Sequence, residues 1–274
     1  MSYYKIVNLD SWNDFKKFAT SAKLEYIYRG ENDSKWDLKS SLDRSSITFD
    51  EYEEGIINDF KRSAKFYMGN EALPNSLLGW YSLIQHYGAP SRLLDFSKSP
   101  YVAAYFAFEE ASSSNAERVG IWVINKIILF QKALNHLKLK PKRQTTGNRY
   151  AFQDEDFQKV IDMSQDGNTS CIFPTEPFFQ NQRYHLQQSI FLAQSNPFIP
   201  LYQQLSFIPS DIIHKAIKKI TIPTSEKNKA IQDMIKMNIT RATLFPGLDG
   251  YAKSLSVKYQ NLLTMGEIWD SKTS

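Results

Sequence analysis

The chain has 274 residues, of which 42% are hydrophobic, and a formal net charge of +4 at pH 7. This size and composition support a large core, whereas so mild a basic balance does not mark a nucleic-acid binder. One cysteine, Cys171, excludes an internal disulfide, and four scattered histidines give no zinc-ligand spacing.

The first third of the chain alternates helical and strand patterns. Trp12, Phe15 and Phe18 recur at helical spacing and predict an inward face. The patterns predict a helix over 11–20, a strand over 24–28 and a helix over 76–84. A further helix is predicted to begin at a capping box, Thr48–Glu51, and to end at about Met68. Arg29 and Gly30 directly follow that strand, and Gly30 is expected to break it.

The densest polar cluster of the sequence lies over residues 85–100. Gly88-Ala89-Pro90 ends the preceding helix, and residues 93–96 are apolar enough for a short buried strand. Ser99 followed by Pro100 predicts an N-cap and first helical position. The helix that follows, 101–108, is apolar almost all round and is expected to be buried, with Ser97 and Ser99 at its N-terminus, where anions are attracted.

The remainder of the chain predicts an α+β fold without a long linker. Strands are expected over 119–124, 189–193 and 217–222, and helices over 126–137, 154–163, 225–237 and 247–263. Residues 138–148 are expected to form an exposed basic loop, 164–182 to be irregular, and 244–246 to form a turn. We therefore expect one domain over 1–274, with a motif-bearing core at about 24–251 and terminal helices packed on it.

The order of the short motifs resembles the FRG domain family, which is named after a Phe/Tyr-Arg-Gly motif. Tyr28-Arg29-Gly30 matches that motif. The other matching segments are Trp36 and Leu38, Gln85–Gly88, Arg92–Phe96, Ser99-Pro100, Arg183 with Gln187-Gln188, and Leu244–Gly250. These segments run from about Ile27 to Tyr251 and cover most of the chain.

A more distant resemblance is to ADP-ribosyltransferases. These enzymes carry an aromatic-Arg-Gly motif on one strand, a Ser-x-Ser element before an Ala- and Phe-rich helix, and a Glu on a later strand. Arg29 matches the first motif and Ser97-Lys98-Ser99 the second. At the third motif this sequence has Gln187 and Gln188, and no Glu occurs between Pro177 and Thr224.

The resemblance implies a core of two small sheets framing a nucleotide cleft, surrounded by helices. It also implies NAD as substrate, with Arg29 gripping a phosphate or ribose, Ser97 orienting the ribose and Gln188 at the third-motif site. His86 is a candidate general base. The expected nucleotide-binding residues are Tyr28, Arg29, Gly30, Arg92, Asp95, Ser97 and Ser99. Asp95 or Glu176 is a candidate for the missing carboxylate.

Several of these residues have structural alternatives. His86 follows a helix C-terminus, where the helix dipole favours it. Arg29 could pair with a nearby carboxylate, and Arg92 and Asp95 could pair with each other. Trp36 is expected to pack in the core more than to stack on a base. Cys171, next to Ile172 and Phe173, is expected to be buried and unreactive.

The leading functional hypothesis is NAD-dependent ADP-ribosyl transfer or NAD hydrolysis by a bacterial toxin or phage-defence effector. The alternatives are a nucleotide-binding module without turnover, and a nuclease or nucleic-acid-binding effector that uses His86, Asp95 and Arg92. The expected partners are NAD or a related nucleotide, an unidentified macromolecular acceptor, and an antitoxin or defence partner. No metal is expected. Since no apolar run could span a membrane and no signal peptide is evident, we expect a cytoplasmic protein.

Overall fold

The computed structural model describes residues 3–45, 50–70, 72–111, 115–140, 150–164, 169–178, 180–197, 199–256 and 259, with the side chains of 50–52 left out. The expected capping box at Thr48, most of the basic loop and the end of the last helix lie outside these residues. Within them, no helix is long and apolar enough to cross a membrane.

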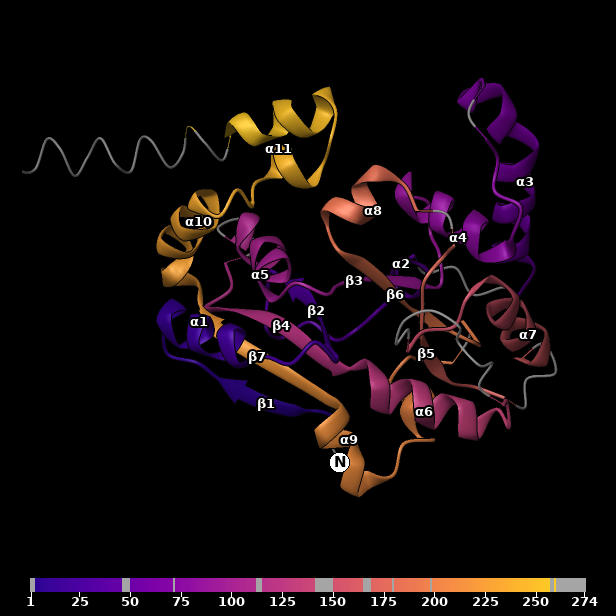
Figure 1. Ribbon diagram of the computed structural model, residues 1–274, viewed down its shortest axis with the longest axis horizontal. Helices are drawn as coiled ribbons and strands as arrows, with labels where there is room; N and C mark the ends of the chain where they lie inside the picture. The colour runs from indigo at the N-terminus through magenta and orange to yellow at the C-terminus, as the bar shows by residue number, and fades with distance from the viewer. Residues whose placement is uncertain are drawn as a thin grey trace, which may run out of the picture.

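The described strands form one mixed seven-stranded sheet with the order β1-β7-β4-β2-β3-β6-β5 (Figure 1). The strands are β1 (Lys5–Asn8), β2 (Tyr26–Glu31), β3 (Leu93–Ser97), β4 (Arg118–Asn125), β5 (Ile172–Thr175), β6 (Ser189–Gln194) and β7 (Ile217–Pro223). β1 pairs with β7 in parallel, and the other neighbours are antiparallel.

The expectation of two separate small sheets is wrong, because β2 and β3 join the two halves. The joint is narrow. β2 pairs with β4 over six residues, from Tyr26↔Asn125 to Glu31↔Gly120, but it pairs with β3 only at Tyr28↔Ser97. Tyr28↔Ser97 is the single pair described between the two central strands, so the ladder has a gap beyond it.

The helices cover the two halves of the sheet. They are α1 (Trp12–Ser21), α2 (Ser41–Arg44), α3 (Asp50–Met68), α4 (Leu77–His86), α5 (Pro100–Glu109), α6 (Lys126–His136), α7 (Asp154–Ser164), α8 (Gln182–Leu186), α9 (Ser210–Ala216), α10 (Lys227–Lys236) and α11 (Arg241–Leu244), with short 3-10 turns at Gln203–Leu205 and Thr224–Glu226. In Figure 1, α1, α5 and α10 lie around one half and α3, α4 and α7 around the other, with α8 and α11 between them at the top.

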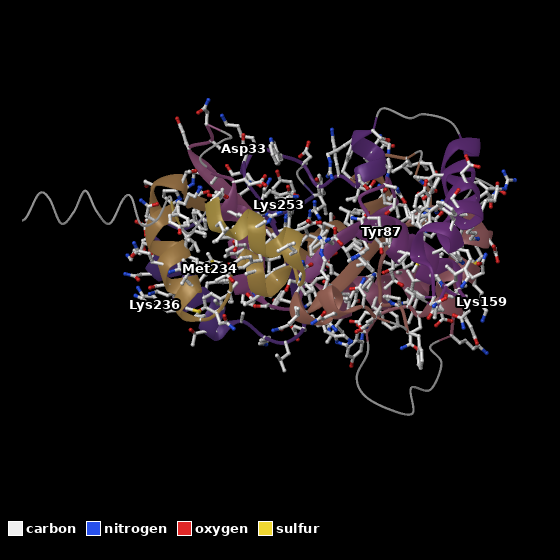
Figure 2. The ribbon with its side chains drawn as sticks, turned by 90° about the horizontal axis from the view of Figure 1, so that it is seen from above. Asp33, Tyr87, Lys159, Met234, Lys236 and Lys253 are labelled. Carbon is white, nitrogen blue, oxygen red and sulfur yellow. The ribbon has the colours of Figure 1, made fainter. Side chains whose placement is uncertain are left out.

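Three buried apolar clusters hold these layers together. The first packs α1, α5 and α10 on one face of β2, β4 and β7 and includes Trp12, Phe108 and Ile121. The second joins α3, α4, α6 and α7 and includes Phe157 and buried Cys171. The third lies under β2, β3, β4 and β6 and includes the indole of Trp122. Figure 2, seen from above, shows Met234 on the α10 side and Lys159 on the α7 side.

Most of the long elements agree with the sequence patterns. Ser11 caps α1, Ser76 caps α4, and Ser99 caps α5 with Pro100 at its first turn. Two expectations are wrong. β2 continues through Arg29 and Gly30 to Glu31, and the region expected to be irregular contains β5. The chain turns after Leu244 as expected, but a short helix that was not expected, α11, precedes the turn.

Candidate functional site

A cavity of about 930 Å³ lies at the gap between β2 and β3. Its walls come from the end of β2 with the following segment 32–44, from β3 and the start of β6, and from α5, α8 and α11 with Phe245. Ligand and cofactor pockets are commonly of this size. The narrow joint in the sheet therefore leaves room for a ligand.

Gly30 allows α5 to lie directly against β2. A Cβ atom at Gly30 would be 2.0 Å from the carbonyl oxygen of Ala103 and 2.6 Å from the amide nitrogen of Ala107. Only glycine permits so close an approach of helix and strand backbones. Ala103 and Phe106 of α5 consequently form one wall of the cavity.

Arg29 spans the gap between the two central strands. Its Nε donates to Glu31 Oε1 at 2.7 Å, and its Nη1 donates to the backbone carbonyl of Asp95 on β3 at 3.0 Å. The Arg29 and Glu31 side chains are only 16% and 9% exposed. Burial by itself lowers the pKa of Arg29, but the Glu31 and Asp95 carboxylates outweigh burial and raise it. The guanidinium is a fixed positive charge in the cavity wall.

Ser97 lines the same cavity, so the structure brings Arg29 and Ser97 together as expected. Its hydroxyl donates to the carbonyl of Gln187 at 2.7 Å and accepts from the Ser99 amide at 3.0 Å. Ser97 thereby ties β3 to the beginning of β6 and to the α5 N-cap. Ser99 accepts from the Val102 amide and is not part of the cavity wall. Ser99 is the N-cap of α5, and its place in the binding set stays a prediction.

Gln188 is misplaced by the sequence interpretation. It is exposed, has φ +49°, and contributes its carbonyl to the Lys98 amide at 2.8 Å. The preceding residue, Gln187, is buried and lines the cavity, and its Nε2 donates to the carbonyl of Leu244 at 3.0 Å. Of these two glutamines, Gln187 is therefore the one that lines the cavity.

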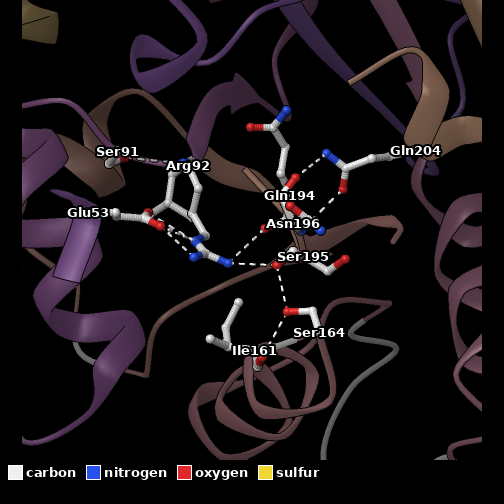
Figure 3. A network of polar contacts seen from close by, with 10 residues as sticks. Glu53, Ser91, Arg92, Ile161, Ser164, Gln194, Ser195, Asn196 and Gln204 are labelled. Atoms are coloured by element: carbon white, nitrogen blue, oxygen red, sulfur yellow. Dashed lines mark hydrogen bonds and ion pairs between the residues drawn. The ribbon is translucent and has the colours of Figure 1, made fainter. Parts of the chain in front are cut away.

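Arg92 makes structural contacts away from the cavity wall. It is buried and donates to both carboxylate oxygens of Glu53 on α3 and to the carbonyls of Gln194 and Ser195 (Figure 3). It does not line the cavity. The expected pairing of Arg92 with Asp95 is wrong.

Asp95 does line the cavity. Its Oδ2 accepts from Gln85 Nε2 at 2.7 Å, and none of the described cations lies within ion-pair distance of its carboxylate. Glu176, the other candidate carboxylate, instead forms an ion pair with Lys98 at 2.7 Å and is absent from the cavity wall.

His86 lies in a small hollow of about 30 Å³ beside the main cavity. The hollow shares Asp95, Arg183 and Gln187 with the cavity wall. The Nδ1 atom of His86 is 3.3 Å from Asn181 Nδ2. His86 is thus a neighbour of the site, not part of its wall.

Several charged wall residues were not assigned to the site from the sequence. Glu31 is one, although it lies two residues after Arg29 and so on the same face of the strand. The others are Lys35, Asp37, Lys39, Arg44, Glu109, Glu110, Arg183 and Arg241. Sequence spacing gives no signal for these, since their elements meet only in the folded chain.

Arg44 lines the cavity without a carboxylate partner among the described residues. Its one hydrogen bond given by the structure runs from Nη1 to the carbonyl of Lys39 at 2.8 Å. Desolvation lowers the pKa of Arg44, and the charge of Arg29 lowers it further. A cation in this position is stabilised by an incoming anion.

Trp36, expected to pack more than to stack on a base, is 49% exposed and lines the cavity. It presents an aromatic surface at the site. Among the described residues, no three side chains capable of binding metal come together. The site thus combines several arginines, the Asp95 carboxylate and the aromatic surface of Trp36, a set suited to an anionic molecule with a ring system.

Comparison with known proteins matches residues 24–116 to the FRG domain. This stretch contains β2, β3 and α5 and so includes Arg29, Asp95 and Ser97. No curated protein and no solved structure matches the chain. The resemblance to ADP-ribosyltransferases stays a prediction.

Proposed function

We propose that this chain, with its FRG domain at residues 24–116, binds NAD in the cavity between β2 and β3 and breaks the bond between nicotinamide and ribose. The observation that carries the proposal is the joint presence of Arg29, Arg44, Ser97 and Asp95 around one cavity of ligand size. ADP-ribose would pass to an acceptor, or to water.

Binding rests on the charge of Arg29 and Arg44. Arg29 is already neutralised by Glu31, whereas Arg44 has no such partner among the described residues. A pyrophosphate accepts hydrogen bonds from guanidinium groups in bidentate geometry. Arg44 is therefore the stronger phosphate ligand, and Arg29 fixes the wall beside it. Trp36 supplies a surface on which a base can stack.

The chemistry requires a carboxylate near the ribose. As the bond breaks, its electron pair leaves with nicotinamide and positive charge develops on the sugar. Acceptor oxygen or nitrogen then bonds to the anomeric carbon and loses its proton. Asp95 stabilises this charge, because its carboxylate has only the amide of Gln85 as partner. Preorganised charge of this kind accounts for about 3–4 kcal/mol of transition-state stabilisation.

Ser97 has a positioning role in this proposal. The Ser97 hydroxyl donates a hydrogen bond to the carbonyl oxygen of Gln187 and so holds two parts of the cavity wall together. His86, in the adjoining hollow, is the candidate base for the acceptor proton. A toxin or phage-defence role, the macromolecular acceptor and an antitoxin stay predictions from the family resemblance.

The test is release of free nicotinamide from NAD. We expect release by the parent protein and a loss of about 100-fold or more in Asp95→Asn, which keeps the shape and removes the charge. Asp59→Asn is the matched control, since Asp59 is 80% exposed on α3. Equal rates in Asp95→Asn and the parent would remove Asp95 from the reaction.

A second candidate function is binding without turnover. It is favoured by one observation: at the start of β6 the cavity wall has Gln187 and no carboxylate. In that case NAD or ADP-ribose binds with measurable affinity, and no nicotinamide is released with or without candidate acceptors. The same assay separates the two functions.

A further inference from the structure

The cavity contains two arginine pairs of similar design. Arg29 and Arg44 lie on the wall made by β2 and α2, and Arg183 and Arg241 on the wall made by α8 and α11. In each pair one guanidinium has a carboxylate partner: Arg29 has Glu31 at 2.7 Å, and Arg241 has Glu109 at 2.8 Å. The other member, Arg44 or Arg183, has none among the described residues.

The second pair is held in place by an aromatic ring. The guanidinium carbons of Arg183 and Arg241 lie 4.3 Å and 4.7 Å from the ring centroid of Phe245. Such cation–π contacts are favourable, but the two guanidinium groups share one ring and carry like charges. The pKa of Arg183 is lowered, mainly by burial; the Asp95 carboxylate acts to raise it, and the charge of Arg241 acts to lower it. The repulsion is relieved if an anion binds between or beside them.

The hydrogen-bonding capacity of this pair is largely unused. Arg183 donates no hydrogen bond to the described residues, although a guanidinium has five N–H groups. The Nε of Arg241 is buried and also lacks a partner. A buried donor without an acceptor costs free energy, so these groups favour a ligand that supplies acceptor oxygens.

We propose that Arg183 and Arg241 form a second anion site that binds a phosphate monoester. The cavity would then prefer a dinucleotide that carries a phosphate in addition to its pyrophosphate, such as NADP, over NAD. The choice of a dinucleotide rests on the proposed function, whereas the anion site rests on the arginine pair alone.

A phosphate monoester fits this pair better than a carboxylate does. It has three acceptor oxygens and a charge of about −1.5 to −2 at pH 7. Arg183 brings a full guanidinium fork, and Arg241 brings its unused Nε while its Nη1 remains on Glu109. The backbone around the pair is fixed, because Gln187 holds the Leu244 carbonyl and a capping box at Thr240 opens α11.

Calorimetry with NAD, NADP and inorganic phosphate tests the proposal. The parent protein is expected to bind NADP about tenfold more tightly than NAD. Arg183→Met keeps an unbranched aliphatic side chain and removes the charge. It is expected to abolish the NADP preference and the binding of phosphate, and to weaken NAD binding much less than NADP binding. Arg62→Met, at an 80% exposed arginine on α3, is the control.

The outcomes separate this proposal from the proposed function. The proposal of a second anion site is overturned if the parent protein binds NAD and NADP with equal affinity. It is also overturned if Arg183→Met still prefers NADP. If neither dinucleotide binds, the proposed function fails, and the phosphate titration then tests the second anion site alone. Phosphate binding to the parent protein that Arg183→Met abolishes supports the site. Phosphate binding that is absent from the parent, or unchanged in Arg183→Met, refutes the site. A melting temperature of Arg183→Met close to that of Arg62→Met shows that the fold is kept. If the fold is lost, Arg183→Lys replaces it and is expected to reduce the preference without abolishing it.

Discussion

Arg29 and Arg44, two arginines of the cavity wall, have different roles. Arg29 neutralises the buried Glu31 and also donates to the Asp95 carbonyl, whereas Arg44 donates only to the Lys39 carbonyl at the cavity mouth. Removal of Arg29 leaves a carboxylate that is 9% exposed without its partner. Removal of Arg44 leaves no buried charge behind. The two variants therefore affect stability and binding differently.

We predict that Arg29→Gln lowers the free energy of unfolding by about 1–3 kcal/mol, and that Arg44→Gln changes it by less than about 0.5 kcal/mol. Arg44→Gln is expected to weaken NAD binding about tenfold. Urea denaturation and calorimetry measure the two effects. The double variant Arg29→Gln/Glu31→Gln is expected to recover part of the stability, because it removes the unpaired carboxylate. Full stability in the single variant Arg29→Gln would contradict the structural role of the ion pair.

At this scale the sequence predicted some cavity residues and misplaced others. Arg29, Asp95 and Ser97 line the cavity because they belong to two strands whose ends meet. Gln188 was misplaced because its positive φ turns the chain, so the residue before it faces the cavity. Arg92 was misplaced because its partner, Glu53, lies 39 residues away on a helix, and no local pattern indicates such a pairing.

The contact between α5 and β2 depends on one residue, Gly30. A Cβ at this position would lie 2.0 Å from a helix carbonyl oxygen, and backbone atoms cannot move aside as a flexible side chain can. We predict that Gly30→Ala lowers stability by about 1–3 kcal/mol or more, since α5 must shift away from the strand. The shift of α5 would also move the cavity wall at Ala103 outward, enlarge the cavity and weaken NAD binding.

Gly55 on α3 provides the matched control for Gly30. A Cβ there meets nothing within 4 Å. Gly55→Ala is therefore expected to stabilise the protein by about 0.5–1 kcal/mol through helix propensity. The same chemical change thus has opposite effects at the two positions, which chemical denaturation measures. A loss of stability in Gly55→Ala equal to that in Gly30→Ala would show that the close approach at Gly30 is not the cause.

The elements that the sequence predicted are those with strong periodicity or clear caps. α1, α4 and α5 have serine N-caps, and β4 is a long apolar strand. β1 and β5 were missed because each is four residues long and lies at an edge of the sheet, where Pro174 is tolerated. α11, also four residues, is defined by its Thr240 capping box rather than by an apolar repeat.

On the scale of the whole molecule, the sequence predicted the arrangement of the strands only in part. Two sheets were expected, and one sheet is present whose halves meet at Tyr28↔Ser97. Strand pairing between residues almost seventy positions apart is not encoded in local patterns. The cavity has the same origin, because it lies where this pairing stops and where α8 and α11 close over the gap.

The half of the molecule around β5 and β6 contains the only cysteine of the chain, Cys171. Its thiol is buried, and burial raises its pKa to about 12. The Cys171 amide donates to Ser195 Oγ, and the Ser195 carbonyl accepts from Arg92. The buried pair of Arg92 and Glu53 therefore holds the segment that covers the cysteine.

We predict that the native protein reacts with a thiol reagent at pH 8 at least about 100-fold more slowly than the urea-unfolded chain, because the thiolate is the reactive form and requires opening of the fold. Arg92→Met leaves Glu53 unpaired, which costs about 3–5 kcal/mol, so labelling should become much faster. Arg62→Met, at an exposed arginine, should leave the rate unchanged. Rapid labelling of the parent protein with its circular dichroism intact would show that this half of the sheet opens independently, and the buried pair would then not control its stability.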